Sequence, residues 1–149
     1  MVVSDPSQSG DAVVKVLCCG SRTFRARGVV KHRLSELPAG TMVIHGDAAG
    51  ADTLSDFAAR EHGFSVRSYP ARWDLEGRGA GPRRNARMIA EEHPDREGVC
   101  LDQCLAFTDD LANSKGTRDM VTRAVKANIP VEVVGSDGGR RVLSGDWIP

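Results

Sequence analysis

Near its start the chain reads Val13-Val14-Lys15-Val16-Leu17-Cys18-Cys19-Gly20-Ser21-Arg22. The first seven of these residues are almost all apolar and rich in valine, a pattern typical of a strand that is buried on both faces. Gly20 ends the run, so a small residue, a hydroxyl and a guanidinium group follow the strand directly. Strands covered on both faces belong to parallel sheets with helices on each side, and this stretch therefore favours an α/β fold.

Strand-like and helix-like segments alternate along the rest of the chain. Short apolar runs predict further strands over residues 41–45, 101–107 and 130–134, and the alternation of apolar and polar residues predicts one over residues 64–69. Apolar residues at helical spacing predict helices before residue 38, between residues 52 and 63, from about residue 83 to 92, and over residues 117–128. Because parallel strands joined by helices need right-handed crossovers, we expect a three-layer α/β/α Rossmann-like fold with a mainly parallel five-stranded sheet. Residues 71–82, rich in glycine and arginine, are expected to form a loop.

Length and composition limit the class of protein. A chain of 149 residues with 40% hydrophobic and 27% charged residues is typical of one globular domain. We expect a flexible tail over residues 1–12, a Rossmann-like domain over residues 13–134, and a tail or edge element over residues 135–149. The first residues do not resemble a signal peptide and no apolar run has membrane-spanning length, so a cytoplasmic protein without membrane contact is expected. Basic and acidic residues number 20 each, which argues against a broad nucleic-acid-binding surface.

Ligands of such sheets bind beyond the carboxyl ends of the strands, where the loops after the strands meet. The first loop, Gly20-Ser21-Arg22, lets a phosphate or ribose approach the backbone closely. The second loop, residues 46–52, leads into a helix whose N-terminal N–H groups favour an anion. Its candidate ligand contacts are Gly46, Asp47 and Gly50. Asp52 either binds a ligand hydroxyl or a metal, or complements the start of the helix.

An arginine-rich segment follows the third predicted strand. Residues 78–87 contain four arginines and no acid. Pro82 suits a first helical turn, so Arg83 and Arg84 are expected beside a helix N-terminus, where forked guanidinium groups match phosphate oxygens. Asn85 is a further candidate contact. The alternative is a solvated basic face without a ligand.

A second phosphate-binding loop is expected where the fourth strand leads into a helix. There the candidate contacts are Ser114, Lys115, Gly116 and Thr117. The alternative is an ordinary helix start with Ser114 or Thr117 as its cap. Trp73, just beyond the third strand, either stacks on a base or covers the edge of the core.

The cysteine and histidine residues predict neither a metal site nor a nucleophile. Cys18 and Cys19 are adjacent on one strand and point to opposite faces, so we expect buried thiols rather than joint metal ligands. Cys100 and Cys104 lack the spacing of a zinc knuckle. His45 ends a strand and either forms hydrogen bonds there or faces the ligand. No metal and no cofactor is expected.

Taken together, five motifs resemble the SLOG superfamily, and most closely its YspA-like (cpYpsA-related) group, found in actinobacteria and their phages. The motifs are Val16-Leu17-Cys18-Cys19-Gly20-Ser21-Arg22, Ile44-His45-Gly46-Asp47-Ala48-Ala49-Gly50-Ala51-Asp52, Pro70-Ala71-Arg72-Trp73, Gly81-Pro82-Arg83-Arg84-Asn85-Ala86-Arg87-Met88 and Ser114-Lys115-Gly116-Thr117. The resemblance covers about residues 14–134 and implies a Rossmann-like domain that binds nucleotides or nucleotide-derived ligands.

The resemblance also implies candidate catalytic residues. In the LOG-type phosphoribohydrolases of this superfamily, which cleave nucleoside monophosphates, an arginine and a glutamate serve catalysis, and the matching positions here are Arg84 and Met120. The arginine is kept and the glutamate is lost. Hydrolysis through an oxocarbenium-like sugar needs a carboxylate, for which Asp119 ranks first and Asp52 second.

Three functions are compatible with these residues. We favour a binding protein that senses a nucleotide-like ligand, because phosphate-binding loops suffice for that role without a placed carboxylate. The alternative is a phosphoribohydrolase of LOG type. A DNA-binding protein ranks third, since the superfamily includes a DNA-binding branch. LOG-type relatives complete their sites across a dimer, so we also expect a homodimer.

Overall fold

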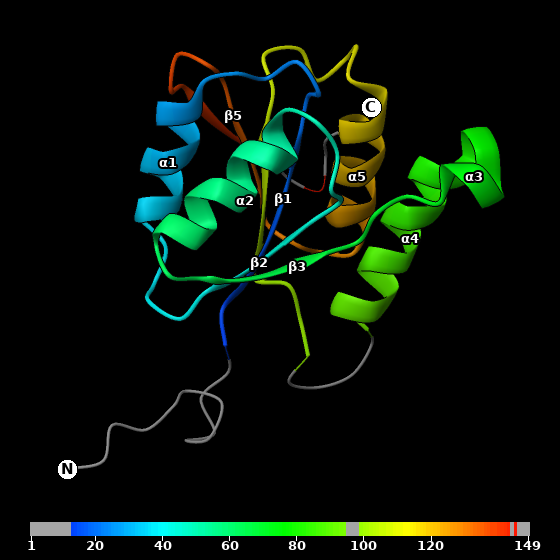
Figure 1. The fold of residues 1–149 in the computed structure, drawn as a ribbon, viewed down its shortest axis with the longest axis horizontal. Helices are drawn as coiled ribbons and strands as arrows, with labels where there is room; N and C mark the ends of the chain where they lie inside the picture. The colour runs from blue at the N-terminus through cyan, green and yellow to red at the C-terminus, as the bar shows by residue number, and fades with distance from the viewer. Residues whose placement is uncertain (1–12, 95–98, 144, 146–149) are drawn as a thin grey trace.

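The computed structural model describes residues 13–94, 99–143 and 145, which form a sheet with helices on both faces (Figure 1). The predicted tail over residues 1–12 lies outside the described residues. The strands are β1 (Lys15–Gly20), β2 (Met42–His45), β3 (Ser65–Ser68), β4 (Gln103–Phe107), β5 (Val131–Val134) and β6 (Arg140–Leu143). The helices are α1 (Arg27–Ser35), α2 (Ala51–Glu61), α3 (Trp73–Glu76), the 3₁₀ helix η1 (Gly77–Gly79), α4 (Ala80–Glu92) and α5 (Lys115–Lys126).

The strands lie in the order β3-β2-β1-β4-β5-β6. Strands β1 to β5 pair in parallel, with Leu17 of β1 opposite both Ile44 of β2 and Cys104 of β4. The predicted Rossmann-like α/β fold is therefore confirmed. The sheet order changes direction between β1 and β4, and in open α/β sheets this point forms the ligand crevice.

The sheet has one strand more than the five predicted. Strand β6 pairs antiparallel with β5, with Arg140 opposite Val134. A tight turn makes this possible, because Gly138 has a φ of 86° and the Gly135 N–H donates to the Gly139 carbonyl at 2.9 Å. Asp137-Gly138 is a common hairpin signal, so the turn was readable in the sequence.

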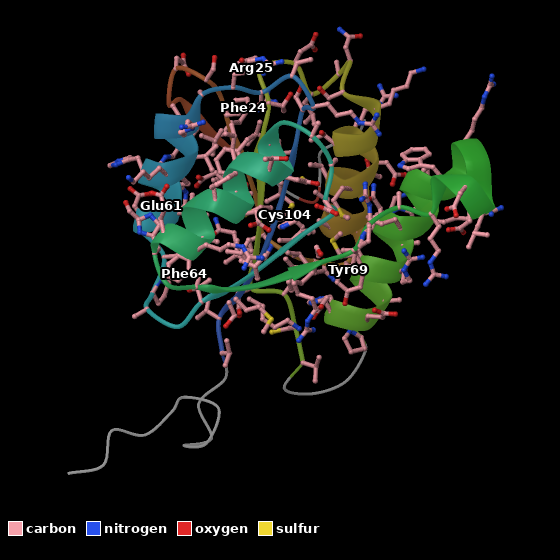
Figure 2. The ribbon with its side chains drawn as sticks, viewed as in Figure 1. Phe24, Arg25, Glu61, Phe64, Tyr69 and Cys104 are labelled. Carbon is pink, nitrogen blue, oxygen red and sulfur yellow. The ribbon has the colours of Figure 1, made fainter. Side chains whose placement is uncertain are left out.

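Each face of the sheet packs against its own pair of helices. Helices α1 and α2 cover one face, and α4 and α5 cover the other. Cys18 and Cys19 point into opposite layers, as the alternation of strand side chains requires. In Figure 2, Phe24 and Phe64 lie on the side of α1 and α2, whereas Tyr69 lies on the α4 side. No helix in the described part of the chain is long and apolar enough to span a membrane.

The segment predicted as a loop, residues 71–82, is largely helical. Trp73–Glu76 form α3, Gly77 ends it with a φ of 58°, and α4 begins at Ala80 after the 3₁₀ turn. A Cβ at Gly81 would lie 3.5 Å from the Trp73 ring, an ordinary van der Waals contact, so the start of α4 packs beside the indole. The loop prediction was wrong because tertiary packing outweighs the low helix propensity of glycine.

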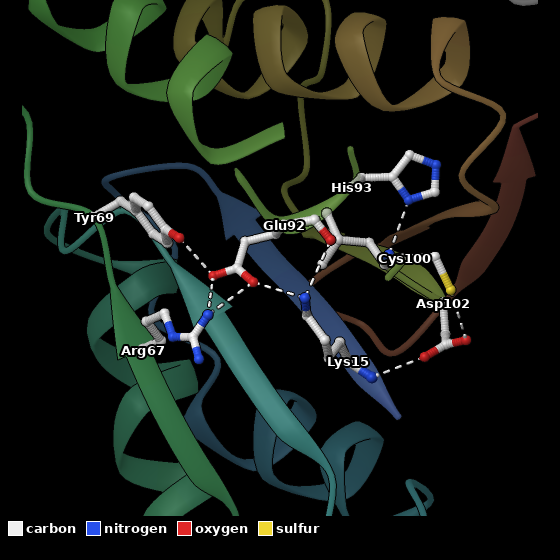
Figure 3. A network of polar contacts seen from close by, with 8 residues as sticks. Lys15, Arg67, Tyr69, Glu92, His93, Cys100 and Asp102 are labelled. Carbon is white, nitrogen blue, oxygen red and sulfur yellow. Dashed lines mark hydrogen bonds and ion pairs between the residues drawn. The ribbon is translucent and has the colours of Figure 1, made fainter. Parts of the chain in front are cut away.

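A buried ion-pair network fixes the far end of α4 to the sheet (Figure 3). The Glu92 carboxylate accepts from Lys15 Nζ at 2.7 Å, Arg67 Nη1 at 2.7 Å and the Tyr69 hydroxyl at 2.5 Å. Burial alone would raise the pKa of Glu92, but these donors outweigh it and hold that pKa below its usual value. The network joins β1, β3 and α4, and so fixes the helix that carries Arg84.

Candidate functional site

A pocket of about 790 Å³ opens at the carboxyl edge of the sheet, where the strand order changes direction. Its wall is built from the loops that follow β1 and β4, from the first turn of α5 and from the inner side of α4. The predicted site residues that line it are Gly20, Ser21, Arg22, Gly46, Asp52, Trp73, Arg84, Asn85, Ser114, Lys115, Gly116, Thr117 and Asp119. Loops far apart in the sequence thus meet at one place.

Three predicted site residues lie elsewhere. Asp47 lines only a smaller neighbouring hollow, and Gly50 and Arg83 line neither. Gly50 serves packing, because a Cβ there would lie 2.5 Å from the Ser21 carbonyl oxygen and the residue has a φ of 75°. The Arg83 side chain is 64% exposed and faces Glu76, with Nη1 3.6 Å from a carboxylate oxygen.

The first turn of α5 presents N–H groups to the pocket. Ser114 occupies the N-cap position but does not cap the helix with its side chain. Its hydroxyl instead donates to the Asp110 carbonyl at 2.7 Å and lies 3.1 Å from the Thr108 hydroxyl. The first turn contains no acid, and Lys115, Gly116 and Thr117 all line the pocket. This helix end favours an anion.

The start of α2 is different, because a carboxyl group already occupies it. Asp52 accepts the N–H groups of Gly46 and Ala48 through Oδ2, each at 3.1 Å, and so closes the loop before the helix. Its Oδ1 is buried without a hydrogen-bond partner among the described residues. Burial raises the pKa of Asp52, although the two N–H groups and the Arg84 charge oppose the shift. Of the two helix starts, only the first turn of α5 contains no acid.

Arg84 lies in the second turn of α4, buried beneath the Gly46 loop. Its Nη1 donates to the carbonyl groups of Gly46 and Tyr69, and its Nε donates to Asn85 Oδ1 at 2.8 Å. Burial lowers the pKa of the guanidinium group, while the Asp52 carboxylate raises it. Arg84 therefore holds two loops together at the wall of the pocket, a role that its sequence position did not predict.

Asp119 faces the pocket from the second turn of α5 and has a fixed orientation. Its Oδ2 accepts from Asn85 Nδ2 at 3.0 Å and from Arg123 Nε at 2.9 Å. Asn85 also donates to the Gly116 carbonyl at 3.3 Å, and thereby connects α4 to the start of α5. Met120, at the position of the LOG glutamate, is only 2% exposed and belongs to the core.

The charges that line the pocket are unevenly paired. Asp109 accepts from the Ser136 N–H and hydroxyl, and Asp110 accepts from Asn113. These donors are neutral, so Asp109 and Asp110 form no ion pair in the described part of the chain, and neither do the cations Arg22, Arg78 and Lys115. Four basic and four acidic residues line the pocket, so an anion is favoured where the cations and the first turn of α5 lie and not by a net charge of the pocket.

Sequence reasoning missed several lining residues. Among them are Thr23, Arg78, Pro82, Thr108, Asp109, Asp110 and Asn113. Residues 108–113 directly follow β4, so the rule that selected the loop after β1 also applied to them. His45 is buried, with its Nε2 2.7 Å from Asp56 and its Nδ1 accepting the Asp47 N–H at 2.9 Å. It therefore serves the loop and does not line the pocket.

Comparisons with known proteins agree with this fold. The sequence model of a family described as the YspA, cpYpsA-related SLOG family matches residues 14–75. The Gene 61 protein of Mycobacterium phage D29 is 38% identical over 126 residues, an alignment that covers 78% of this chain and 93% of the phage protein. The chain belongs to the YspA, cpYpsA-related SLOG family. The predicted SLOG membership is confirmed, and the phage relative agrees with the expectation of a group that includes phage proteins.

The SLOG fold of this chain also resembles a solved structure. DNA processing protein A (DprA) from Streptococcus pneumoniae matches with a TM-score of 0.63 at 19% sequence identity. The match covers 82% of this chain and 50% of the DprA chain, so the SLOG chain spans half the length of that protein. At this identity the likeness concerns the fold alone.

Proposed function

We propose that this SLOG protein binds a nucleotide or nucleotide-derived ligand in the pocket at the carboxyl edge of its sheet and serves as a ligand sensor. The observation that carries the proposal is the first turn of α5, which has no acid and no side-chain cap and faces the pocket. Membership of the SLOG superfamily supports a nucleotide-related ligand.

The attraction between the pocket and the ligand is electrostatic. An anion at a helix N-terminus is stabilised by roughly 0.3–1 kcal/mol, and charge-assisted hydrogen bonds from arginine and lysine add to this. Lys115, Arg22 and Arg78 supply such donors at the pocket wall. A volume of about 790 Å³ lies within the range of small-molecule sites, so a nucleoside fits beside its phosphate.

A thermal-shift screen tests the proposal. The panel contains AMP, GMP, CMP, UMP, cyclic AMP, NAD and ADP-ribose, and chromatography of each mixture detects released base. A ligand at 100 times its Kd stabilises the fold by about 2.7 kcal/mol, which raises the Tm by roughly 5–10 °C for a chain of this size. The proposal fails if no compound raises the Tm.

A single-stranded oligonucleotide belongs in the same panel, because the fold neighbour DprA is named for DNA processing. We expect it to bind weakly, since the chain carries no net charge. Stabilisation by the oligonucleotide alone, lost steeply with added salt, would replace the small-molecule proposal with DNA binding.

Hydrolysis of the ligand is the second candidate function, and the orientation of Asp119 favours it. Asn85 and Arg123 hold one carboxylate oxygen of Asp119 at the pocket wall, as a group that stabilises an oxocarbenium-like sugar requires. Base release in the screen, abolished by Asp119→Asn, would establish this activity. Asp74→Asn, on the exposed side of α3, is the matched control.

A further inference from the structure

A second hollow of about 270 Å³ adjoins the large pocket. The two share the lining residues Arg22, Gly46, Ala48, Trp73 and Arg84. A molecule that fills the large pocket therefore reaches the second hollow by passing these residues. The remaining wall of the second hollow comes from the loop after β2 and from the segment that joins β3 to α3.

Two guanidinium groups stand where the hollows meet. Arg22 lies over the Trp73 ring, with its Cζ 5.5 Å from the ring centroid, and Arg84 lies under the Gly46 loop. Arg22 has no carboxylate partner among the described residues. A group that crosses between two arginines is favoured when it is anionic. Arg22 offers the guanidinium fork that matches phosphate oxygens, whereas Nε and Nη1 of Arg84 already donate to Asn85, Gly46 and Tyr69, so Arg84 contributes mainly its charge.

The far wall of the second hollow presents a hydrogen-bond acceptor. Asp47 has a φ of 57°, a left-handed conformation rare outside glycine, and its N–H donates to His45 Nδ1 at 2.9 Å. The Asp47 side chain forms no ion pair within the described ranges. An ionised carboxylate accepts hydrogen bonds only, so its partner must bring donors such as hydroxyl groups.

The rest of the second hollow is small and apolar. Ala49, Pro70 and Ala71 line it, and Trp73 is 49% exposed beside them. A sugar matches this combination, because its C–H face packs on an indole while its hydroxyls donate to a carboxylate. Aspartate in Rossmann-type sites binds ribose hydroxyls through the same chemistry.

We infer that the second hollow is a sugar subsite, and that the ligand is a nucleoside diphosphate whose terminal phosphate carries a second sugar. The nucleoside occupies the large pocket, the charged linker passes Arg22 and Arg84, and the second sugar meets Asp47 and Trp73. This inference rests on the proposed function and specifies its ligand class.

Calorimetric titration of matched ligand pairs tests the inference. Each nucleoside diphosphate is compared with its sugar ester: ADP with ADP-ribose, GDP with GDP-mannose, and UDP with UDP-glucose. We expect at least one sugar ester to bind about tenfold more tightly than its diphosphate. Ala71→Leu fills the second hollow and should remove this preference while leaving the affinity for the diphosphate unchanged. Asp47→Asn keeps the left-handed backbone accessible and should reduce the preference.

Ala39→Leu is the matched control, because Ala39 is exposed and precedes β2, at the opposite edge of the sheet. It should leave every affinity unchanged. Equal affinity of the wild-type protein for each diphosphate and its ester would overturn the sugar subsite and leave nucleotide binding intact. Failure of every compound to bind would overturn the proposed function and the subsite together.

Discussion

Replacement of Gly46 by alanine tests how Arg84 is held at the pocket wall. A Cβ at Gly46 would lie 2.5 Å from Arg84 Cζ and 3.0 Å from Nε, closer than side chains tolerate. The guanidinium group has no easy escape, since it is buried and donates to the carbonyls of Gly46 and Tyr69 and to Asn85. Gly46→Ala must therefore displace it.

The expected loss of stability follows from these contacts. Overpacking a well-packed interior costs about 1–3 kcal/mol, and a lost hydrogen bond to a charged group costs about 1.5–3 kcal/mol. Water can hydrogen-bond to the displaced guanidinium group and offsets part of these two costs. We therefore expect Gly46→Ala to lower the free energy of unfolding by about 2–3 kcal/mol in total. This corresponds to a fall in Tm of roughly 4–12 °C.

Urea unfolding of a double-mutant cycle measures the effect. Arg84→Ala removes the guanidinium group with which the new methyl group would clash, so in that background Gly46→Ala should lower the free energy of unfolding by less than about 0.5 kcal/mol. The coupling energy between the two positions is then about 2 kcal/mol. Gly116→Ala is the control, because a Cβ at this helical glycine meets nothing within 4 Å. Equal costs of Gly46→Ala in both backgrounds would refute the reasoning.

Three further predictions concern the rest of the molecule. Glu92→Gln should lower the free energy of unfolding at neutral pH and make it depend less on pH in acid. The pKa of Glu92 is lowered in the folded protein. The stabilisation by the Glu92 carboxylate is therefore fully present above its unfolded pKa of about 4.3 and is lost as the pH falls through its folded pKa. Unchanged unfolding curves from pH 7 to 3 would disprove this. Asn85→Ala should remove one of the two donors that hold Asp119 and weaken nucleotide binding, measured by calorimetry, because Asn85 connects α4 to α5. Unaltered affinity would count against that connection. The chain should form a homodimer in solution, and light scattering that detects only a 16.0 kDa species would exclude it.

The fold could be predicted largely because its central strands β1, β2, β4 and β5 are mostly apolar runs. The run that ends at Gly20 has the length and the nearly continuous apolar character of a buried strand. Its last residue must be glycine, because a Cβ there would lie too close to the Phe107 carbonyl oxygen. Residues 135–149 were predicted as a tail or edge element without a choice between the two. Asp137-Gly138 marked the turn before β6, but Arg140 and Arg141 on this exposed edge strand lack an apolar alternation that would have identified a strand.

The site could be predicted only in part, since sequence position identifies loops and not the direction of their side chains. The loop before α5 was predicted to bind phosphate because of its hydroxyl groups. In the structure no side chain caps the first turn of α5, so its backbone N–H groups are the donors available to an anion. Arg83 and Arg84 are adjacent and look equivalent in the sequence, yet one is exposed and the other is buried under Gly46. Their difference arises from contacts 38 residues apart, which no local pattern encodes.

The central claim is that the first turn of α5 binds the phosphate of a nucleotide. Gly116→Asp places a carboxylate in that turn without steric conflict, because the space beside Gly116 is open, and Gly116→Ala is the uncharged match. Calorimetric titration uses whichever of AMP, GMP, CMP and UMP binds the wild-type protein most tightly. The account predicts unchanged affinity for the alanine variant and a loss of about tenfold or more for the aspartate variant. Equal affinity of all three proteins would contradict it.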